Sequence, residues 1–416
     1  MSRKNEYDIA IVGGGLVGIS LAYALGELDP APKVILIEAY DYASLPPPSF
    51  DSRTVALSYS SRQIFSALGL WPAIAEQACP ISTIHISDRG HPGMTRLRAE
   101  EQNVQALGYV VENRVLGQCL FKTLPDVSGL EVLAPAKVTG INNEADASAT
   151  LSVDVKGEAT EISAKLIIAA DGTESFVRQS LGISQRHWDY HQSAVIANLA
   201  VDKTHNNIAY ERFTQSGPMA LLPLVSYKQD QHRYGLVWTV PQQNTEQVMQ
   251  LDDQEFATQL EKRFGRRIGK ITRVGERASY PLGLNQISQH VQHRLAFIGN
   301  AAHTLHPVAG QGFNLGLRDV ATIVEVIKTA FANGQDIGEL SVLNEYARWR
   351  SKDHNTTMMF TDALVRVFSN NFPPLVLARN AGLMAMDMFA PLRKRVTRHA
   401  MGYVGKASLL ARGLGL

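Results

Sequence analysis

The stretch that decides the fold is YDIAIVGGGLVG, at residues 7–18. Residues 7–12 predict a short buried strand, and the small and apolar residues 16–28 predict a helix. Between them, Gly13, Gly15 and Gly18 form a G-x-G-x-x-G spacing. These glycines let the amides at a helix N-terminus approach a pyrophosphate without interference from Cβ atoms. A second apolar run at residues 34–39 completes a βαβ unit, so this region predicts a dinucleotide-binding fold.

Glu38 closes the second expected strand, twenty residues after Gly18. A carboxylate at this place accepts hydrogen bonds from both ribose hydroxyls of an adenosine, whereas it would repel a 2′-phosphate. The position therefore favours FAD or NAD over NADP in this slot.

Composition sets the broad class of the chain. Its 416 residues suggest two or three domains, and 40 basic against 39 acidic residues leave no field that would attract nucleic acid. Cys79 and Cys119 belong to no C-x-x-C pair or His/Cys cluster, which argues against a disulfide framework or a zinc site. This cysteine usage fits a reducing cytoplasm. Because no uninterrupted apolar run is long enough for a membrane span, we expect a soluble cytoplasmic protein.

The α/β pattern returns twice along the chain. Strands are expected at 164–170 and 295–298, and a helix at about 313–332; residues 54–68 have a helical apolar period. Residues 81–87 and 195–240 instead alternate as antiparallel strands do. We therefore expect a nucleotide domain made of residues 1–78, 106–182 and 276–350. An antiparallel substrate domain would comprise 79–105 and 183–275, and a C-terminal helical region 351–416.

A second glycine-rich motif favours FAD over NAD as the cofactor. It reads GNAAHTLHP at residues 299–307 and continues as GQGFNLGLRD at 310–319. Small residues let the chain pass close to a bulky cofactor, and a helix N-terminus there can stabilise negative charge on a reduced flavin ring. A tight connection between a strand and a helix would also carry glycines, so this motif does not decide the matter alone.

With these motifs and DGTESFVR at 171–178, the chain resembles FAD-dependent aromatic hydroxylases of the para-hydroxybenzoate hydroxylase type. Further stretches, FDSR at 50–53, ISDRG at 86–90, ERFT at 211–214 and residues 310–319, are similar to the hydroxylases of ubiquinone biosynthesis. Among those, the 2-polyprenyl-6-methoxyphenol hydroxylases look closest. The resemblance implies an α/β fold with a Rossmann-like, GR2-like FAD-binding domain, an inserted antiparallel β-sheet substrate domain and a C-terminal helical region.

The resemblance also implies which residues contact FAD. They are Gly13, Gly15, Gly18, Glu38, Arg53, Arg114, Asp171, Gly172, Gly299, Asn300, Ala309, Gly310, Gln311, Gly312, Phe313 and Asn314. The first four would hold the ADP half, the two arginines the pyrophosphate and ribityl region, and Asp171 and Gly172 a groove shared with NAD(P)H. Asn300 replaces the family's usual aspartate, but an amide can still bind a ribityl hydroxyl. Pro307 would lie beside the flavin ring at the catalytic position.

The implied reaction is a ring hydroxylation that uses NAD(P)H and dioxygen. NAD(P)H reduces FAD, dioxygen adds to the reduced flavin, and the resulting hydroperoxide transfers one oxygen atom to a polyprenylated methoxyphenol. No metal is required, and no side chain is assigned as the base that would deprotonate the phenol. The alternatives are a sister hydroxylase acting at another ring position, an FAD-dependent isoprenoid reductase, and a flavin-bearing assembly subunit that binds other ubiquinone-synthesis proteins.

Histidines and the C-terminal region complete the pattern. His303 and His306 have no third ligand nearby in sequence, and His187 with His191 underdetermines a metal site, so we interpret all four as ordinary packing or hydrogen-bonding residues. Six of the ten methionines lie between residues 358 and 401, and after Asp387 the chain has six basic residues and no acid. This suits peripheral contact with an anionic membrane or an acidic partner, or a solvated face of packed helices.

Overall fold

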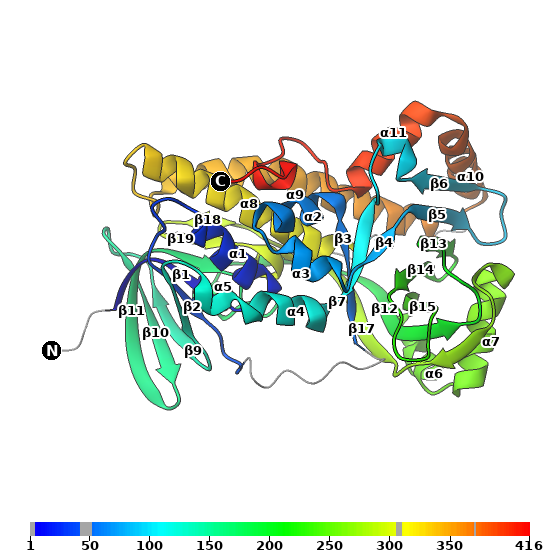
Figure 1. Cartoon of the computed structure of the whole chain (residues 1–416), viewed down its shortest axis with the longest axis horizontal. Helices are drawn as coiled ribbons and strands as arrows, with labels where there is room; N and C mark the ends of the chain where they lie inside the picture. Colours follow the sequence, from blue (N-terminus) through cyan, green and yellow to red (C-terminus); the bar gives the residue numbers. More distant parts are fainter. Residues whose placement is uncertain (1–4, 42–51, 305–309, 370–371) are drawn as a thin grey trace.

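The structure is a computed structural model that describes residues 5–41, 52–304, 310–369 and 372–416 (Figure 1). Three sheets of eight, nine and three strands organise these segments. The eight-stranded sheet lies at one end of the molecule and the nine-stranded sheet at the other, and long helices run between them (Figure 1). The mixed α/β class predicted from the sequence is confirmed.

A parallel core forms the centre of the eight-stranded sheet. Its path is β18 (Val291–Gln292), β19 (Leu295–Phe297), β11 (Glu158–Ala169), β1 (Asn5–Val12), β2 (Val34–Ile37) and β8 (Leu130–Leu133), and β10 (Ala149–Val155) and β9 (Lys137–Asn142) extend it from β11. The pairs from β19 to β8 are parallel. Ile9 and Ile11 of β1 pack into one apolar cluster, whereas Ala10 and Val12 pack into another. Because both faces are buried, the strand reads as a continuous apolar run.

Helices cover this sheet. They include α1 (Leu16–Gly26), α4 (Asn113–Lys122), α5 (Phe176–Ser180) and α8 (Gln311–Ala332). The side chain of Val17 on α1 lies 3.2 Å from the position that a Cβ of Gly299 would take, and 3.0 Å from that of Gly316 on α8. Glycines at these two positions therefore allow α8 to pack closely against α1.

The nine-stranded sheet is the predicted β-rich insertion. It contains β5 (Thr83–Asp88), β6 (Met94–Arg98), β12 (Gln185–Val201), β13 (Ile208–Thr214), β14 (Gly217–Leu224), β15 (Arg233–Pro241), β16 (Ile271–Val274), β17 (Ala278–Ile287) and β20 (His303–Thr304). Its pairs are antiparallel except for β13 with β5. On one face, Trp238 packs on Phe256 of α7 (Asp253–Phe264), beside α6 (Thr245–Met249). On the other face, Phe213 stacks on Phe368 of α9 (Leu340–Phe368), with ring centroids 3.7 Å apart.

The helix predicted at residues 54–68 is wrong for its first five residues and confirmed for most of the rest. Residues 54–58 form β3 (Thr54–Ser58), which pairs with β7 (Gly108–Glu112), and β7 in turn pairs with β4 (Cys79–Ile81). Only α2 (Tyr59–Ala67) is helical, and α3 (Trp71–Ala75) follows it. The N–H of Ser61 donates to Oγ of Ser58 at 3.3 Å, which caps the helix at its true start. The strand forms because its backbone groups form hydrogen bonds with β7, about fifty residues further along the chain. The apolar period of residues 54–68 gives no information about this distant partner.

The C-terminal helical region is confirmed as α9, α10 (Pro373–Met388) and α11 (Ala390–Ala400). None of the single helices in the described segments has the length and apolarity of a membrane span; α10 and α11 meet that criterion only as a pair, bent by 100°. The domain boundaries stay a prediction. Strands β17 and β20, which belong to the nine-stranded sheet, fall within the range 276–350 that we predicted for the nucleotide domain.

Candidate functional site

A pocket of about 1290 Å³ opens at the carboxyl ends of β1, β2 and β11. This edge of a parallel sheet is where nucleotides bind in open α/β folds. The pocket brings together seven of the predicted cofactor residues: Gly13, Gly15, Glu38, Arg53, Arg114, Asp171 and Gly172. They come from five separate parts of the chain, so the fold assembles a single site from distant motifs.

The three glycines of the cradle have different structural roles. Gly13 has a φ of +103°, and a Cβ there would lie 2.6 Å from the carbonyl oxygen of Ala170; a Cβ on Gly18 would lie 1.9 Å from the carbonyl oxygen of Gly13. Both positions therefore need glycine for close packing of strand and helix. Gly15 is the N-cap of α1 and has no atom within 4 Å of its Cβ position. A side chain at Gly15 would project into open space in the pocket, so this surface fits a closely bound ligand.

Glu38 lies at the rim of the pocket with its carboxylate held by the backbone. Oε2 accepts a hydrogen bond from the N–H of Gly14 at 2.6 Å, and Oε1 accepts one from the N–H of Tyr40 at 2.9 Å. Each carboxylate oxygen has a second lone pair, which leaves capacity to accept from a ribose hydroxyl. The carboxylate is thus oriented before a ligand arrives.

Two arginines supply positive charge to the same pocket. The Arg53 guanidinium lies 4.6 Å from the ring centroid of Tyr280 on β17, which orients it, and Arg114 lies in the first turn of α4. In the same pocket, Oδ2 of Asp171 accepts from the N–H of Val177 at 3.2 Å, and burial raises the pKa of this carboxyl. Guanidinium groups bind phosphate oxygens in bidentate geometry, so the arginines fit a pyrophosphate.

The third motif begins beside the cradle helix. Gly299 starts a short turn, has a φ of +58° and packs against Val17 of α1. Asn300, the residue that departs from the family pattern, is exposed. Residues 305–309 lie outside the described segments, and with them the predicted Pro307, Ala309 and His306. Gly310 follows as the left-handed N-cap of α8, with a φ of +60°.

The first turn of α8 is fastened to β3 and α2 by Asn314. Its Oδ1 accepts from the N–H of Ser58 and the hydroxyl of Ser61, both at 2.7 Å. Its Nδ2 donates to the carbonyl oxygens of Ala56 at 2.8 Å and Gly310 at 2.6 Å. These four bonds use the full capacity of the amide. Asn314 therefore shapes the loop through protein contacts.

The other three residues of this turn differ in exposure. Phe313 stacks on Phe65 of α2, with ring centroids 6.5 Å apart, and Gln311 is buried. Gly312 has no atom within 4 Å of its Cβ position, as at Gly15. Direct contact of these residues with FAD stays a prediction.

A buried network of charged and polar side chains holds the segment that begins at Gly299. Asp319 of α8 accepts from Nε2 of His303 at 2.9 Å, Nε2 of His354 at 2.6 Å, Nε of Arg350 at 2.6 Å and the N–H of Gly299 at 3.0 Å. Burial alone would raise the pKa of Asp319, but the charges of His354 and Arg350 hold it well below its usual value. His303 is thus a buried hydrogen-bonding residue, as expected.

Although ligand atoms of His303, Asp319 and His354 lie within 4.8 Å of one another, the Arg350 guanidinium already balances the carboxylate. We interpret this network as structural, and the absence of a metal stays a prediction. His187 and His191 lie on or beside the bulge of β12 rather than on a helix, and Nδ1 of His187 hydrogen-bonds Oδ1 of Asn285 at 2.6 Å.

Glu211 on β13 is a candidate residue to which the sequence analysis gave no role. Glu211 pairs with Ala220 on β14. The paired positions on the next strands continue across the sheet to Ala278 on β17, so Glu211 and Ala278 point to the same face. Strand alternation therefore puts Glu211 on the same face as Phe213, which α9 covers, and Tyr280, which contacts Arg53 of the pocket. Oε1 of Glu211 is buried without a hydrogen-bond partner among the described residues, and burial raises its pKa to about 8. Perturbed carboxyl groups of this kind cluster at functional sites.

A family model described as an FAD binding domain matches residues 6–361. The chain belongs to the FAD-binding domain family. It is 38% identical to the ubiquinone hydroxylase UbiL of Rhodospirillum rubrum, a match that covers 96% of this chain and 91% of that protein. It is 33% identical to the 3-demethoxyubiquinol 3-hydroxylase of Escherichia coli, over 95% of this chain and 98% of that protein. The family model confirms FAD as the cofactor, and the two relatives confirm the predicted similarity to ubiquinone-biosynthesis hydroxylases.

Solved structures agree on the fold of this family member. The p-nitrophenol 4-monooxygenase PnpA of Pseudomonas putida has a TM-score of 0.76 at 18% identity, and the superposition covers 95% of this chain and 98% of that one. PqsL of Pseudomonas aeruginosa has a TM-score of 0.75 at 17% identity, over 92% of this chain and 100% of that one. At such low identity these likenesses concern the fold, and they confirm the predicted Rossmann-like architecture.

Proposed function

We propose that the protein is an NAD(P)H- and FAD-dependent monooxygenase that hydroxylates the aromatic ring of a polyprenylated methoxyphenol in ubiquinone biosynthesis. The observation that carries this proposal is the pocket that unites the cradle, Glu38 and the two arginines in a chain whose full-length relatives are named ubiquinone hydroxylases. We further propose that the enzyme works in the cytoplasm and receives its substrate from a membrane or a carrier.

The residues present fit FAD. Gly15 and the first amides of α1 would hold the pyrophosphate, Arg53 and Arg114 would neutralise it, and Glu38 would accept from the adenosine ribose. Asn300 would bind a ribityl hydroxyl, and Pro307 would lie beside the ring. FAD, when bound, supplies the electron transfer and oxygen activation that side chains cannot perform. Asp171 and Gly172 would line the path by which NAD(P)H approaches.

Glu211 would hold and move the proton of the substrate. We place the phenol between the start of α8 and the sheet face that carries Glu211, Phe213 and Tyr280. The carboxylate of Glu211 would accept the proton of the phenol hydroxyl, which raises the electron density of the ring at the carbon that is hydroxylated. The burial that raises the pKa of Glu211 would also restrict the access of water to the substrate, and this would limit unproductive release of reduced oxygen.

A sister hydroxylase acting at another ring position is the second candidate. It is favoured by the 33% identity to a protein named for 3-hydroxylation of demethoxyubiquinol. Both candidates share the pocket and the proposed role of Glu211; they differ only in the carbon atom that faces the flavin ring.

Deletion of the gene is expected to stop ubiquinone synthesis at one hydroxylation and to accumulate a polyprenylated methoxyphenol. The measurement is mass spectrometry of the extracted lipids, in which the missing hydroxyl and the methoxy group identify the ring position. The matched control is the deletion strain complemented with the wild-type gene. Accumulation of a demethoxy intermediate would select the sister reaction, and unchanged ubiquinone would contradict the proposed pathway.

A further inference from the structure

Helix α10 is fixed to the protein by a buried polar anchor on its inner face. Arg379 Nε and Asn380 Nδ2 both donate to Oδ2 of Asp88 at 2.8 Å, and the N–H of Gly93 donates to Oδ1 of Asn380 at 2.9 Å. A Cβ on Gly93 would lie 2.3 Å from that amide oxygen, so the loop between β5 and β6 approaches the helix as closely as glycine permits. Breaking a buried ion pair is costly, and α10 is therefore held in one rotation about its axis.

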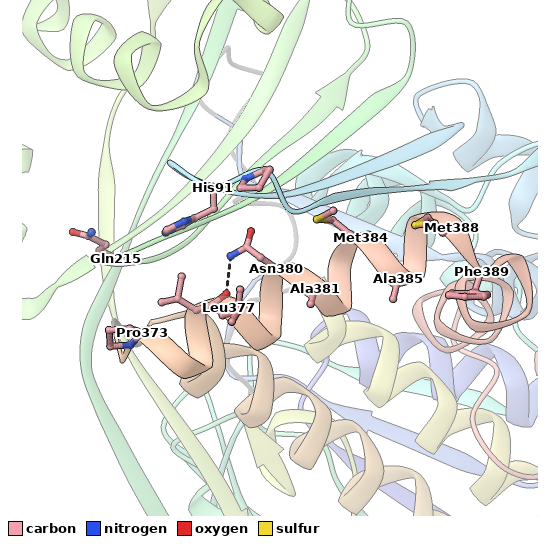
Figure 2. A pocket seen from close by; sticks show the side chains of 12 residues that line it. His91, Gln215, Pro373, Leu377, Asn380, Ala381, Met384, Ala385, Met388 and Phe389 are labelled. Atoms are coloured by element: carbon pink, nitrogen blue, oxygen red, sulfur yellow. Dashed lines mark hydrogen bonds between the residues drawn. The ribbon is translucent and has the colours of Figure 1, made fainter.

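The outer face of the anchored helix is apolar and exposed. Leu377, Met384 and Met388 are 73%, 46% and 77% exposed, and their spacing of seven and four residues places them on one side of α10. Figure 2 shows these side chains along the helix, with His91 and Gln215 on the other wall of the groove that they line. Phe389 and Leu392 continue the apolar surface into α11, with 61% and 46% exposed. A contiguous patch of this kind marks an interaction site.

Positive charge adjoins this patch on α11. Lys394, Arg395 and Arg398 are exposed, and none forms an ion pair with another residue in the described part of the chain. Arg395 lies three residues, one helical turn, after the exposed Leu392. The whole chain has a net charge of only +1, so this positive charge is a local feature of the surface.

We infer that the α10–α11 surface docks on an anionic lipid bilayer, with Leu377, Met384 and Met388 in the interfacial layer and the α11 cations at the headgroups. The 16 residues of α10 span about 24 Å at about 1.5 Å per residue, less than the roughly 30 Å hydrocarbon core. The inner anchor holds α10 against the protein, and the bend of 100° turns α11 away from the axis of α10, so the pair fits a position along the bilayer surface better than a straight span. An apolar face flanked by unpaired cations is the pattern of a helix that lies in the membrane interface. The inference does not rest on the proposed function, although a polyprenylated substrate would reside in the same bilayer.

Cosedimentation with vesicles tests this surface. The purified holoprotein is expected to bind vesicles of phosphatidylcholine with phosphatidylglycerol, to bind phosphatidylcholine alone weakly, and to dissociate as salt screens the charges. Leu377→Glu with Met388→Glu is expected to weaken binding at least tenfold, because two apolar side chains no longer enter the interface. Each of Lys394→Ala and Arg395→Ala is expected to weaken it about fivefold.

The matched controls are the same types of substitution, Leu→Glu and Lys→Ala, at exposed positions outside α10 and α11. Leu340→Glu alters a leucine that is 42% exposed at the far end of the 29-residue helix α9, and Lys328→Ala removes an exposed cation of α8; both are expected to bind like the wild type. FAD content and turnover of a short-chain soluble phenol, measured on the same samples, are expected to be unchanged in every variant. This separates failure of the docking surface from failure of the proposed function.

Failure of the wild type to bind anionic vesicles would overturn the inference, as would equal binding by the Leu377→Glu/Met388→Glu variant. Light scattering supplies a further outcome: a wild-type dimer that this variant dissociates would assign the surface to a second copy of the chain instead.

Discussion

Gly15→Val is expected to yield a folded protein that lacks FAD. The backbone at Gly15 tolerates a side chain, because its φ is ordinary and no atom lies within 4 Å of its Cβ position. The added methyl groups would instead occupy the space where we place the pyrophosphate. Loss of two charge-assisted hydrogen bonds of about 1.5 kcal/mol each weakens FAD binding by roughly 100-fold. The measurement is flavin absorbance of the purified protein, followed by titration with FAD.

The control for this change is Gly382→Val on α10, where there is likewise no atom within 4 Å of the Cβ position but no pocket. It should retain FAD. A Gly15→Val protein that purifies with its flavin would show that the cradle does not hold the cofactor. The same variant distinguishes catalysis from assembly in the deletion strain: restored ubiquinone in the absence of flavin would favour the assembly-subunit alternative, whereas we expect no restoration.

Glu211→Gln is expected to lower the turnover of the phenol roughly 100-fold, the usual contribution of a positioned general base. Glutamine is nearly isosteric but cannot accept the phenol proton. Because the pKa of Glu211 is raised to about 8, the carboxylate that acts as the base forms only as the pH rises through that value. The wild-type rate should therefore rise with pH in this window, and the rise should disappear in the variant. Stopped-flow measurement of product formation as a function of pH provides the test.

Two companions separate a catalytic role from a structural one. Glu211→Asp keeps a carboxylate and should retain part of the rate together with its pH dependence. A fluorinated phenol, which ionises without help, should be hydroxylated by Glu211→Gln at close to the wild-type rate. FAD content and reduction of the flavin by NAD(P)H should not change in either variant. Equal turnover of the ordinary phenol by wild type and Glu211→Gln would remove Glu211 from the mechanism.

The convergence of the predicted cofactor residues on one pocket could be predicted from the sequence because most of its determinants are local. Gly13, Gly15 and Gly18 lie between adjacent elements, and Glu38 follows at the end of the next strand, so spacing alone defines their geometry. Asp171 and Gly172 follow the end of β11, and their presence in the same pocket follows from the parallel pairing of β11 with β1. Strand order joins motifs that the sequence separates by more than a hundred residues.

Contacts without a local pattern could not be predicted. The strand at Thr54–Ser58 depends on its distant partner β7, and the anchor of α10 joins Arg379 to Asp88, 291 residues apart. In the sequence, Glu211 is one polar residue among the alternating residues of a strand. Its burial, and the face of the sheet on which it lies, depend on the registers of β13, β14 and β15 together. The Asp319 network likewise needs α9 in place before His354 and Arg350 reach the carboxylate. Long-range packing decides each of these features.

The most direct test of the proposed reaction is to supply isotopically labelled dioxygen to the FAD-loaded protein with NAD(P)H and a polyprenylated methoxyphenol. Mass spectrometry of the lipid product measures the origin of the new hydroxyl. We predict that the product gains one labelled oxygen atom on the ring for each NAD(P)H consumed in productive turnover. A product that gains hydrogen and no labelled oxygen, or whose hydroxyl comes from water, would contradict the assignment as a monooxygenase.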